Sequence, residues 1–412
     1  MSKPRKLQIP DDRSERLFYI KRMFPQASGP DLKDAWHGGR HEAQRRLSGM
    51  DALAYERNHH FLNGAVTRLS PYLRHGCITL NEACNSIRAK YGAKAEKLIF
   101  AFAWRDYWRQ VWYRFGDDIL SDMEAAKVMI GHDPLADDIR NGTTGLPCMD
   151  GFISDLLTDG YVHHHARMWF AAYVLHWRKV DWRAAADWYQ EHLLDGDMAS
   201  NHLSWQWVAS SFSSKPYYFN KESLARYTGE KYCASCTKTC PFDDSYDGLH
   251  IKLFPEVIPG SPEQHKVDRP TRPAVSTQTA LAVFVHDEML SAANPIVQQS
   301  LHKIFVFDDH LHGKWSLNRL QFMADCLNEM PEVDVWLGDA REVLAERGIG
   351  QVITQATPNQ EIRAMLAPFS PKWQAEPKLV DVDISSKRLK RFSRYWDKVG
   401  PLLMGNAEYR QP

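Results

Sequence analysis

The chain has 412 residues, of which 44% are hydrophobic and 25% charged, and its basic and acidic residues balance to a formal net charge of +0. This length predicts about two or three domains, and the neutral balance excludes a basic field over the whole surface, so a nucleic-acid site would be a local patch. No apolar run reaches the length of a membrane span and no signal peptide opens the chain, so we expect a cytoplasmic protein without a membrane partner.

The first half of the sequence is typical of helices. Residues 1–35 are charged and interrupted by proline, with one helix expected near Asp12–Met23. From Trp36 to about Tyr218, apolar residues recur at spacings of three and four, which predicts a helical domain. The expected helices are Ala43–Asn58, Thr79–Lys90, Ala95–Phe115, Met149–Thr158, Val162–Trp177 and Trp182–Leu193.

The second half changes in character. Residues 219–250 are expected to form a cysteine-bearing loop, and Pro255–Val275 is rich enough in proline, serine and charge for an interdomain linker. Beyond it, short β-branched runs alternate with helical patterns, which predicts a parallel sheet with helices on both faces. The expected strands are Thr279–Val285, Lys303–Phe307, Val333–Leu337, Gln351–Thr354 and Lys378–Val382, and the expected helices are Leu317–Asn328, Ala340–Glu346, Asn359–Leu366 and Arg388–Trp396. We therefore divide the chain into a helical domain (1–254), a linker (255–275) and an α/β domain (276–412).

The stretch Asp195–Trp207 (DGDMASNHLSWQW) concentrates polar and aromatic side chains. Asp195 and Asp197 can accept hydrogen bonds from sugar or ribityl hydroxyls, and Asn201 offers both a donor and an acceptor. By itself, a helix that begins at a capping aspartate and packs its tryptophans is the simpler explanation.

Several motifs precede this stretch. Thr67-Arg68-Leu69-Ser70 follows Tyr55, and its hydroxyls and guanidinium at a helix start suit a pyrophosphate. Further motifs are Trp104-Arg105-Asp106-Tyr107, the G-x-T-G-x-P run ending at Asp150, the run Gly160–Met168, and Asp181-Trp182-Arg183. In this order, the motifs together resemble the FAD-binding domain of the photolyase and cryptochrome superfamily.

The resemblance implies an all-helical domain that binds FAD in a folded conformation. The cofactor-binding residues that it implies are Tyr55, Thr67, Arg68, Leu69, Ser70, Arg105, Arg167, Asp195, Gly196, Asp197 and Asn201. It also implies that Asn201 faces flavin N5, that Trp205 is the nearest electron donor, and that Trp182 belongs to the electron path.

Three cysteines, Cys233, Cys236 and Cys240, are closely spaced. Such spacing indicates either a zinc site that lacks its fourth ligand or three corners of an iron–sulfur cluster. Cys148 occupies the position at which the iron–sulfur bacterial cryptochromes and (6-4) photolyases carry a ligand. The resemblance to that subfamily therefore implies a [4Fe–4S] cluster bound by Cys148, Cys233, Cys236 and Cys240, with the last two cysteines closer in sequence than in the subfamily.

The run His163-His164-His165 also invites a metal site. Consecutive residues of a helix point about 100° apart, so three neighbours cannot converge on one ion. By resemblance, His164 is the proton donor of (6-4) photolyases, and a packed or surface histidine is the alternative. Ala101 replaces the glutamate that binds the dimer in cyclobutane-dimer photolyases, which favours the (6-4) photoproduct as the substrate.

The order of the domains departs from the superfamily, in which an α/β antenna domain comes first. Here a Rossmann-like α/β domain follows the FAD-binding domain, which implies a permuted order; the antenna chromophore cannot be assigned. We expect a photolyase-type DNA lyase that transfers an electron from reduced FAD to a UV-induced pyrimidine lesion, in single- or double-stranded DNA. The alternatives are a cryptochrome-type blue-light photoreceptor that signals to a protein partner and a redox flavoprotein with incidental photochemistry.

Overall fold

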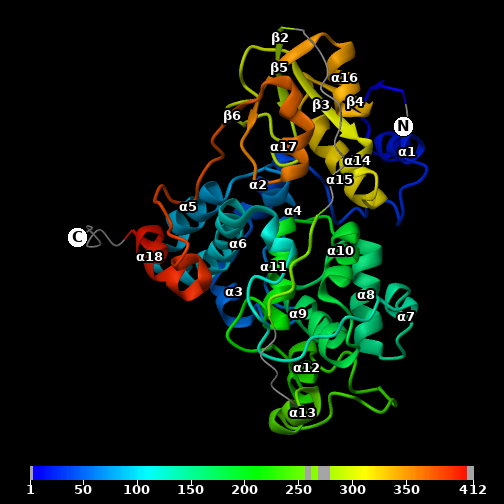
Figure 1. The fold of residues 1–412 in the computed structure, drawn as a ribbon, viewed down its shortest axis with the longest axis vertical. Coiled ribbons are helices and arrows are strands. Elements are labelled where there is room, and N and C mark those ends of the chain that lie inside the picture. The colour runs from blue at the N-terminus through cyan, green and yellow to red at the C-terminus, as the bar shows by residue number, and fades with distance from the viewer. Residues whose placement is uncertain (1–2, 256–260, 268–278, 406–412) are drawn as a thin grey trace. The chain divides into compact units, whose positions relative to one another are not determined.

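The computed structural model describes residues 3–255, 261–267 and 279–405, which form two compact units (Figure 1). The α/β unit comprises Met1–Met50, Thr67–Ser86 and Val267–Asp381, and the helical unit comprises Asp51–Val66, Ile87–Lys266 and Val382–Pro412. The predicted domains 1–254 and 276–412 therefore group the two ends of the chain differently from the contacts in the structure. Residues 256–260 and 268–275 of the predicted linker lie outside the described residues.

A six-stranded sheet forms the centre of the α/β unit. Its strands, in the order β1-β4-β3-β2-β5-β6, are β1 (Arg5–Leu7), β4 (Val333–Gly338), β3 (Lys303–Asp308), β2 (Ala280–Val285), β5 (Ile349–Gln355) and β6 (Lys372–Gln374). All neighbours are parallel except β1 and β4. Four predicted strands are confirmed. The strand predicted at Lys378–Val382 is wrong, because β6 pairs with β5 earlier in the chain, and the edge strand β1 was not predicted.

Helices cover both faces of this sheet, as predicted. On one face, α16 (Ala340–Glu346) and α17 (Gln360–Leu366) pack their apolar side chains against Phe284 and Val306. The opposite face carries Phe307, whose ring lies 5.2 Å from that of Phe24. The remaining helices of the unit are α1 (Arg13–Met23), α2 (Arg40–Ser48), α4 (Ser70–Arg74), α14 (Asp309–His312) and α15 (Leu317–Asn328), followed by the 3-10 turn η4 (Ala367–Phe369).

The first residues of the chain join the α/β unit through α1 and α15. Every residue from Leu317 to Leu327 of α15 is buried, including Asp325. The Arg16 guanidinium lies 2.8 Å from the Asp325 carboxylate and neutralises it. Gln321 of α15 also donates a hydrogen bond to Leu17 O at 2.9 Å. These buried polar contacts explain why the N-terminal residues cluster with the sheet rather than with the helices.

The helical unit contains no strand of the sheet and consists of helices and loops in its described part. Its main helices are α3 (Ala52–Asn58), α6 (Glu96–Phe115), α8 (Pro147–Asp159), α9 (His164–Ala172), α10 (Trp182–His192), α11 (Met198–Ala209), α12 (Lys221–Thr228), α13 (Tyr246–Leu253) and α18 (Phe392–Met404). Shorter turns are η1 (Gly92–Ala95), η2 (Gly116–Leu120), α7 (Asp137–Arg140), the π-helical η3 (Tyr173–Trp177) and η5 (Arg388–Lys390). The helix α5 (Leu80–Tyr91) crosses the division between the two units.

Three helix predictions need correction. The single helix expected at Ala43–Asn58 is two helices, because Asp51 caps a new start by accepting from Leu53 N and Ala54 N. The loop expected at 219–250 contains α12 and most of α13. The last helix begins at Phe392 rather than at Arg388, after a 3-10 turn.

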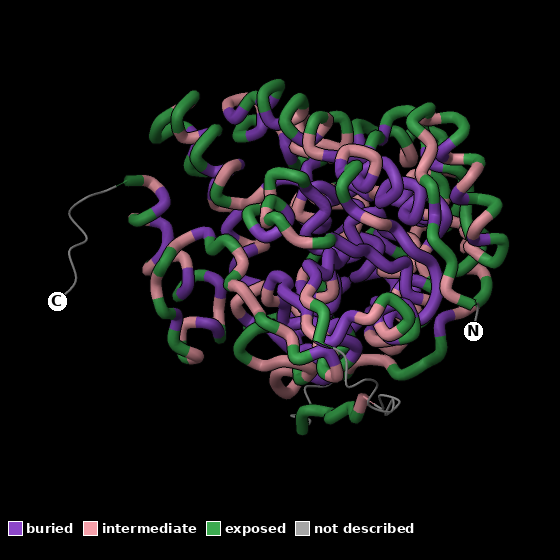
Figure 2. The backbone as a smooth tube through the Cα atoms, turned by 90° about the horizontal axis from the view of Figure 1, so that it is seen from above, coloured by how far each residue is buried: buried purple, intermediate pink, exposed green. Residues whose placement is uncertain are grey.

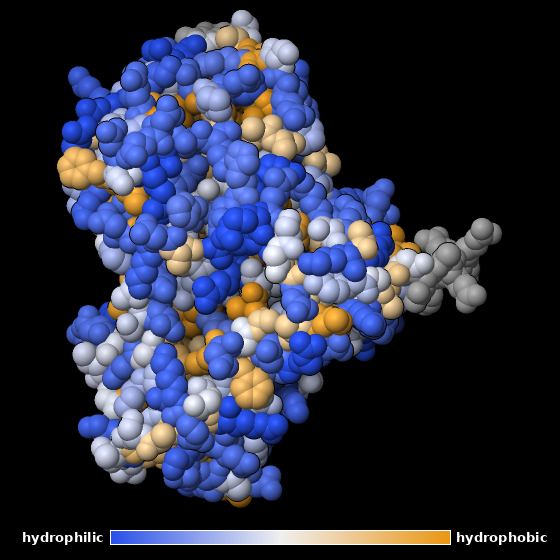
Figure 3. Space-filling view, turned by 180° about the vertical axis from the view of Figure 1, so that it is seen from behind, coloured by the Kyte–Doolittle hydropathy of each residue, from blue (hydrophilic) through white to orange (hydrophobic). Residues whose placement is uncertain are grey.

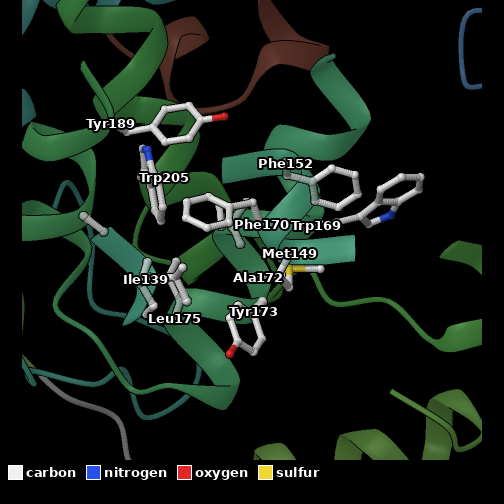
Figure 4. Packing of buried hydrophobic residues seen from close by; sticks show 14 of the residues in the cluster. Ile139, Met149, Phe152, Trp169, Phe170, Ala172, Tyr173, Leu175, Tyr189 and Trp205 are labelled. Atoms are coloured by element: carbon white, nitrogen blue, oxygen red, sulfur yellow. The ribbon is translucent and has the colours of Figure 1, made fainter. Parts of the chain in front are cut away.

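Aromatic side chains fill the core of the helical unit (Figure 4). Trp169 and Trp182 are among its fully buried residues. Buried stretches of the backbone lie inside and exposed ones at the periphery (Figure 2), and the face in Figure 3 is mainly hydrophilic with scattered hydrophobic residues. Within the described residues, no helix combines the length and apolar character needed to cross a membrane.

Candidate functional site

The predicted site begins where α11 begins. Asp197 is the N-cap of this helix and accepts a hydrogen bond from Ser200 N at 2.7 Å. Its other carboxylate oxygen lies 3.2 Å from Arg105 of α6. The helix cap that we considered the simpler explanation is therefore present, and the same carboxylate also neutralises a nearly buried guanidinium.

Asp195 makes a second ion pair two residues earlier. Both of its carboxylate oxygens lie 3.1 Å from the Arg167 guanidinium of α9, and Arg167 also donates to Val162 O at 2.8 Å. Burial alone would lower the pKa of Arg167, but the negative charge of Asp195 outweighs it and the pKa is raised. Two arginines predicted from the motifs are thus held beside the two aspartates.

Asn201 is buried between α10 and α11. Its amide nitrogen donates to Ala186 O at 2.8 Å, and its amide oxygen accepts from the Trp205 indole N–H at 3.1 Å. The side chain therefore fixes the orientation of Trp205. Its predicted position opposite flavin N5 stays a prediction, as do the roles of the other site residues.

Trp205 is one of several neighbouring aromatic rings. Its centroid lies 5.8 Å from that of Tyr189 and 6.2 Å from that of Phe170, as Figure 4 illustrates. Tyr189 in turn lies 6.3 Å from Trp188. Trp182 has different neighbours: its indole N–H donates to Asp122 at 2.8 Å, and its ring lies 6.3 Å from His202.

Two buried hydroxyls near this stretch indicate a missing polar partner. Neither Tyr189 Oη nor Ser200 Oγ has a hydrogen-bond partner among the described residues, although both atoms are buried. Buried polar groups are nearly always paired in folded proteins. Together with the two arginine–aspartate pairs, these hydroxyls fit a ligand that carries several oxygen acceptors and donors, as FAD does.

The remaining predicted cofactor residues are divided between the units. Thr67-Arg68-Leu69-Ser70 leads into α4 of the α/β unit, and Arg68 has a positive φ of 49°, which is uncommon for a residue with a side chain. Tyr55 lies on α3 of the helical unit, where burial raises its pKa to about 12. Gly196 is buried and donates its N–H to Leu193 O at 3.2 Å.

A separate cavity of about 280 Å³ in the helical unit is lined by aromatic and basic side chains. Trp104 and Trp207 line it together with Lys215 and Arg391. One face of Trp104 is stacked on Phe392 of α18, with ring centroids 3.8 Å apart at 8°. The sequence identified Trp104 and Trp207 by their motifs but gave no sign that the C-terminal helix lies against them.

Interactions on either side of Phe392 hold α18 in this position. Tyr395 donates a short hydrogen bond to the buried carboxylate of Asp106. The Arg391 guanidinium contacts both oxygens of Glu124 at 2.7 and 2.8 Å. This pair lowers the pKa of Glu124 against the opposing effect of burial.

The four predicted cluster cysteines lie in one region of the helical unit. Cys148 is buried in the first turn of α8, whereas Cys233, Cys236 and Cys240 are half-buried in the loop after α12. Burial raises the pKa of the Cys148 thiol to about 12, and the thiols of Cys233 and Cys240 add to this rise. All of these cysteines are free thiols, and their chemistry suits thiolate ligands, but among the described residues no three of their sulfur atoms lie within 4.8 Å of one another.

Gly151 allows the cysteine loop to approach α8 closely. A Cβ at this position would lie 2.6 Å from a ring carbon of Tyr232, the residue before Cys233. A larger residue would therefore require the Tyr232 side chain to move. The sequence analysis did not identify this close contact between α8 and the cysteine loop.

The histidine run is divided by the helix start. His163 is the N-cap of α9, and His164 is its first residue. The structure places His164 beside His59 and His60, which the sequence analysis did not consider. Burial lowers the pKa of His164 well below its ordinary value, and the neighbouring imidazoles lower it further. In the protein alone, His164 is therefore neutral at pH 7.

Comparisons with known proteins find relatives for part of this chain. Residues 98–240 match the family model described as the FAD binding domain of DNA photolyase. The deoxyribodipyrimidine photo-lyase of Streptomyces griseus is 32% identical over 212 residues, which are 50% of this chain and 46% of that protein. The cryptochrome DASH of Ostreococcus tauri is 27% identical over 49% of this chain and 39% of its own length. The (6-4)DNA photolyase of Arabidopsis thaliana is 27% identical over 59% of this chain and 45% of its own length.

Residues 98–240 are therefore similar to the FAD-binding domain of DNA photolyase, as the motifs predicted. The segment matched by the family model runs from α6 to Cys240 within the helical unit. The chain spans about half the length of the curated relatives it matches or less.

Proposed function

We propose that this chain is a photolyase-type DNA lyase that uses blue light to repair a UV-induced pyrimidine lesion. The observation that carries the proposal is the start of α11. There Arg105 and Arg167 pair with Asp197 and Asp195, beside two buried hydroxyls that have no hydrogen-bond partner in the described part of the chain. This arrangement lies inside the segment that matches the photolyase FAD-binding domain. Bound FAD would supply a light-absorbing, one-electron donor.

The polar residues of the site would bind and orient this cofactor. Arg105 and Arg167 are neutralised by their carboxylates, which leaves further N–H groups free to meet ligand oxygens. The Asn201 amide is fixed by Ala186 O and by the Trp205 indole, so its position is set before any ligand arrives. We also propose Tyr55, Thr67, Arg68, Leu69 and Ser70 as contacts to the cofactor, on the basis of their motif.

The neighbouring aromatic rings support a path for electrons into the site. Trp205, Tyr189 and Trp188 follow one another at ring distances of 5.8 and 6.3 Å. Trp205 would be the donor nearest the flavin, and Trp188 or Tyr189 would pass the electron on. Trp182 remains a proposed member on the basis of its motif.

The aromatic cavity would hold the lesion. Enzymes that act on a base in DNA extrude it from the duplex and stack it on aromatic side chains. Trp104 and Trp207 offer such surfaces, and Lys215 and Arg391 lie where phosphates could be neutralised. A chain with no net charge would need such a local basic site to bind DNA.

We favour the (6-4) photoproduct over the cyclobutane dimer. His164 and Ala101 support this choice by resemblance. Because burial keeps His164 neutral in the protein alone, it can act as a proton donor only if the bound lesion or its phosphate raises the pKa of the imidazole. Replacing His164 with alanine should abolish (6-4) repair and leave binding of lesion DNA largely intact.

We further propose that Cys148, Cys233, Cys236 and Cys240 bind a [4Fe–4S] cluster. The motif spacing and the electrostatic influence of Cys233 and Cys240 on the buried thiol of Cys148 support this site. A cluster there would tie the loop to the helical unit. The α/β unit, in which five of the six strands of the sheet follow the FAD-binding domain in the chain, would correspond to the antenna domain of the superfamily in permuted order.

The test is repair of synthetic oligonucleotides that contain one defined lesion, with reduced, FAD-loaded protein under blue light and in the dark. Light-dependent restoration of the (6-4) photoproduct would support the full proposal, and repair of the cyclobutane dimer alone would support the lyase but not its substrate. Single- and double-stranded substrates should be compared.

A cryptochrome-type photoreceptor is the second candidate function. The stacking of Phe392 on Trp104 favours it, because an internal side chain already covers one aromatic face of the cavity. Under this alternative, illumination would change the conformation or assembly of the protein without repairing either lesion.

A further inference from the structure

We propose that His59, His60 and His164 form a binding site for a divalent metal ion of the zinc class. One ring nitrogen from each residue lies within 4.8 Å of the others in the helical unit. His59 and His60 follow the end of α3, and His164 begins α9. Two helix ends thus bring together three imidazoles that are far apart in the sequence.

The rings are arranged so that one ion can be shared. The ring centroids of His59 and His60 lie 3.8 Å apart, and that of His164 lies 5.8 Å from His59 and 6.4 Å from His60. His59 is buried and His164 is half-buried, whereas His60 is accessible at the surface, so an ion could reach the group from solvent. Small shifts of side chains would suffice to bring all three nitrogens to coordinating distance.

A hydrogen bond fixes the tautomer of His59. Its Nδ1 lies 2.6 Å from the Tyr55 carbonyl oxygen, which can only accept a hydrogen bond. Nδ1 therefore carries the proton, and Nε2 keeps its lone pair for a metal. Metal-binding histidines are usually oriented in this way by a second hydrogen bond. The backbone of His60 is held as well, because its carbonyl oxygen lies 2.7 Å from His165 Nδ1.

The charge state of the group suits a cation. Burial lowers the pKa of His60 to about 4, and neighbouring histidines and Lys97 lower it further. Burial also lowers the pKa of His59 and His164. The imidazoles are therefore neutral at pH 7, which is the form that binds metals.

The ligand set selects the class of ion. Three imidazoles without a carboxylate suit Zn²⁺, Cu²⁺ or Ni²⁺ rather than the oxygen-seeking Mg²⁺ and Ca²⁺. Three protein ligands also leave a fourth position for water or another ligand. If the proposed function holds, an ion bound to His164 would prevent this residue from donating a proton, and Zn²⁺ would then inhibit (6-4) repair.

Zinc binding to the full chain tests the site without any assay of repair. Apo-protein would be titrated with Zn²⁺ as wild type, as His60→Ala and as His250→Ala, a matched change at an exposed histidine of the same unit. We expect His60→Ala to bind one zinc ion fewer per chain, or to bind it at least about tenfold more weakly, and His250→Ala to match wild type.

The cysteines can also bind zinc, so the comparison would be repeated with Cys236→Ser in every protein. In the Cys236→Ser background, His60→Ala must still bind less zinc, or bind it more weakly, than His250→Ala. Equal zinc stoichiometry and affinity in the two histidine variants would overturn the proposal. His60→Gln, which keeps most of the side-chain volume, would show the same loss if His60→Ala proved to be poorly folded.

Discussion

Replacing Asp197 should separate its structural role from its role in the cofactor site. Asp197→Ala removes the cap of α11, which accepts from Ser200 N at 2.7 Å, and leaves Arg105 without the carboxylate 3.2 Å away. Loss of an N-cap costs about 1 kcal/mol, and loss of a hydrogen bond between charged groups costs roughly 1.5–3 kcal/mol. We therefore expect Asp197→Ala to lower the free energy of unfolding by about 2.5–4 kcal/mol.

Asp197→Asn is the informative partner variant. Asparagine caps helices as well as aspartate does, so this change should remove only the negative charge beside Arg105 and cost about 1–2 kcal/mol. Both variants should release FAD more readily than wild type, because each removes the negative charge that positions the Arg105 guanidinium.

The assay is flavin absorbance per chain after gel filtration, together with urea unfolding followed by circular dichroism. Asp137→Asn is a suitable control, because it makes the same change at an exposed carboxylate of α7 in the same unit. Full flavin content in Asp197→Ala, or equal destabilisation by the Ala and Asn variants, would refute the reasoning.

Three further predictions concern other parts of the helical unit. Trp205→Phe should keep bound FAD but slow its photoreduction by an external reductant, because phenylalanine is much harder to oxidise; unchanged kinetics would place the electron path elsewhere. Cys148→Ser should lose about four iron atoms per chain and lower the thermal stability, whereas Cys77→Ser should do neither; one zinc and no iron in anaerobically purified protein would contradict the cluster. Burial lowers the pKa of His176 from 6.5 to about 4, so the unfolded chain binds the proton first as the pH falls. Between pH 7 and pH 5, the free energy of unfolding of wild type should therefore fall by about 2 kcal/mol more than that of His176→Gln. Urea unfolding that gives the same change with pH for both proteins would exclude this effect.

The regular elements could be predicted because the helices show a long hydrophobic period and the central strands are continuous apolar runs. The strands β2, β3, β4 and β5 each have six or seven residues of mainly buried side chains. The edge strands could not be predicted in the same way. With only three residues, β1 and β6 are too short to show a period, and most of their side chains are at least partly exposed.

The sequence predicted those residues of the candidate site that can be recognised from a single local motif. Asp195 and Asp197 were found from their own stretch, and Arg105 and Arg167 from theirs. The packing of Phe392 on Trp104 was not predicted, because these residues are far apart in the sequence and no local pattern connects them.

The histidine group was missed because the sequence argument considered only neighbours in one helix. That argument was wrong about the rings: His163 is the N-cap, and the ring of His164 stacks on those of His163 and His165 at 4.3 and 5.0 Å. The nitrogens that come within 4.8 Å of one another join His164 to His59 and His60, which follow another helix.

The claim that unites the site is that the helical unit binds FAD at the start of α11. Its most direct test is the identity and amount of flavin that wild-type protein releases on denaturation, measured by chromatography against FAD and FMN standards. The account predicts close to one FAD per chain after reconstitution. Recovery of FMN, or of no flavin from folded protein incubated with excess FAD, would contradict it.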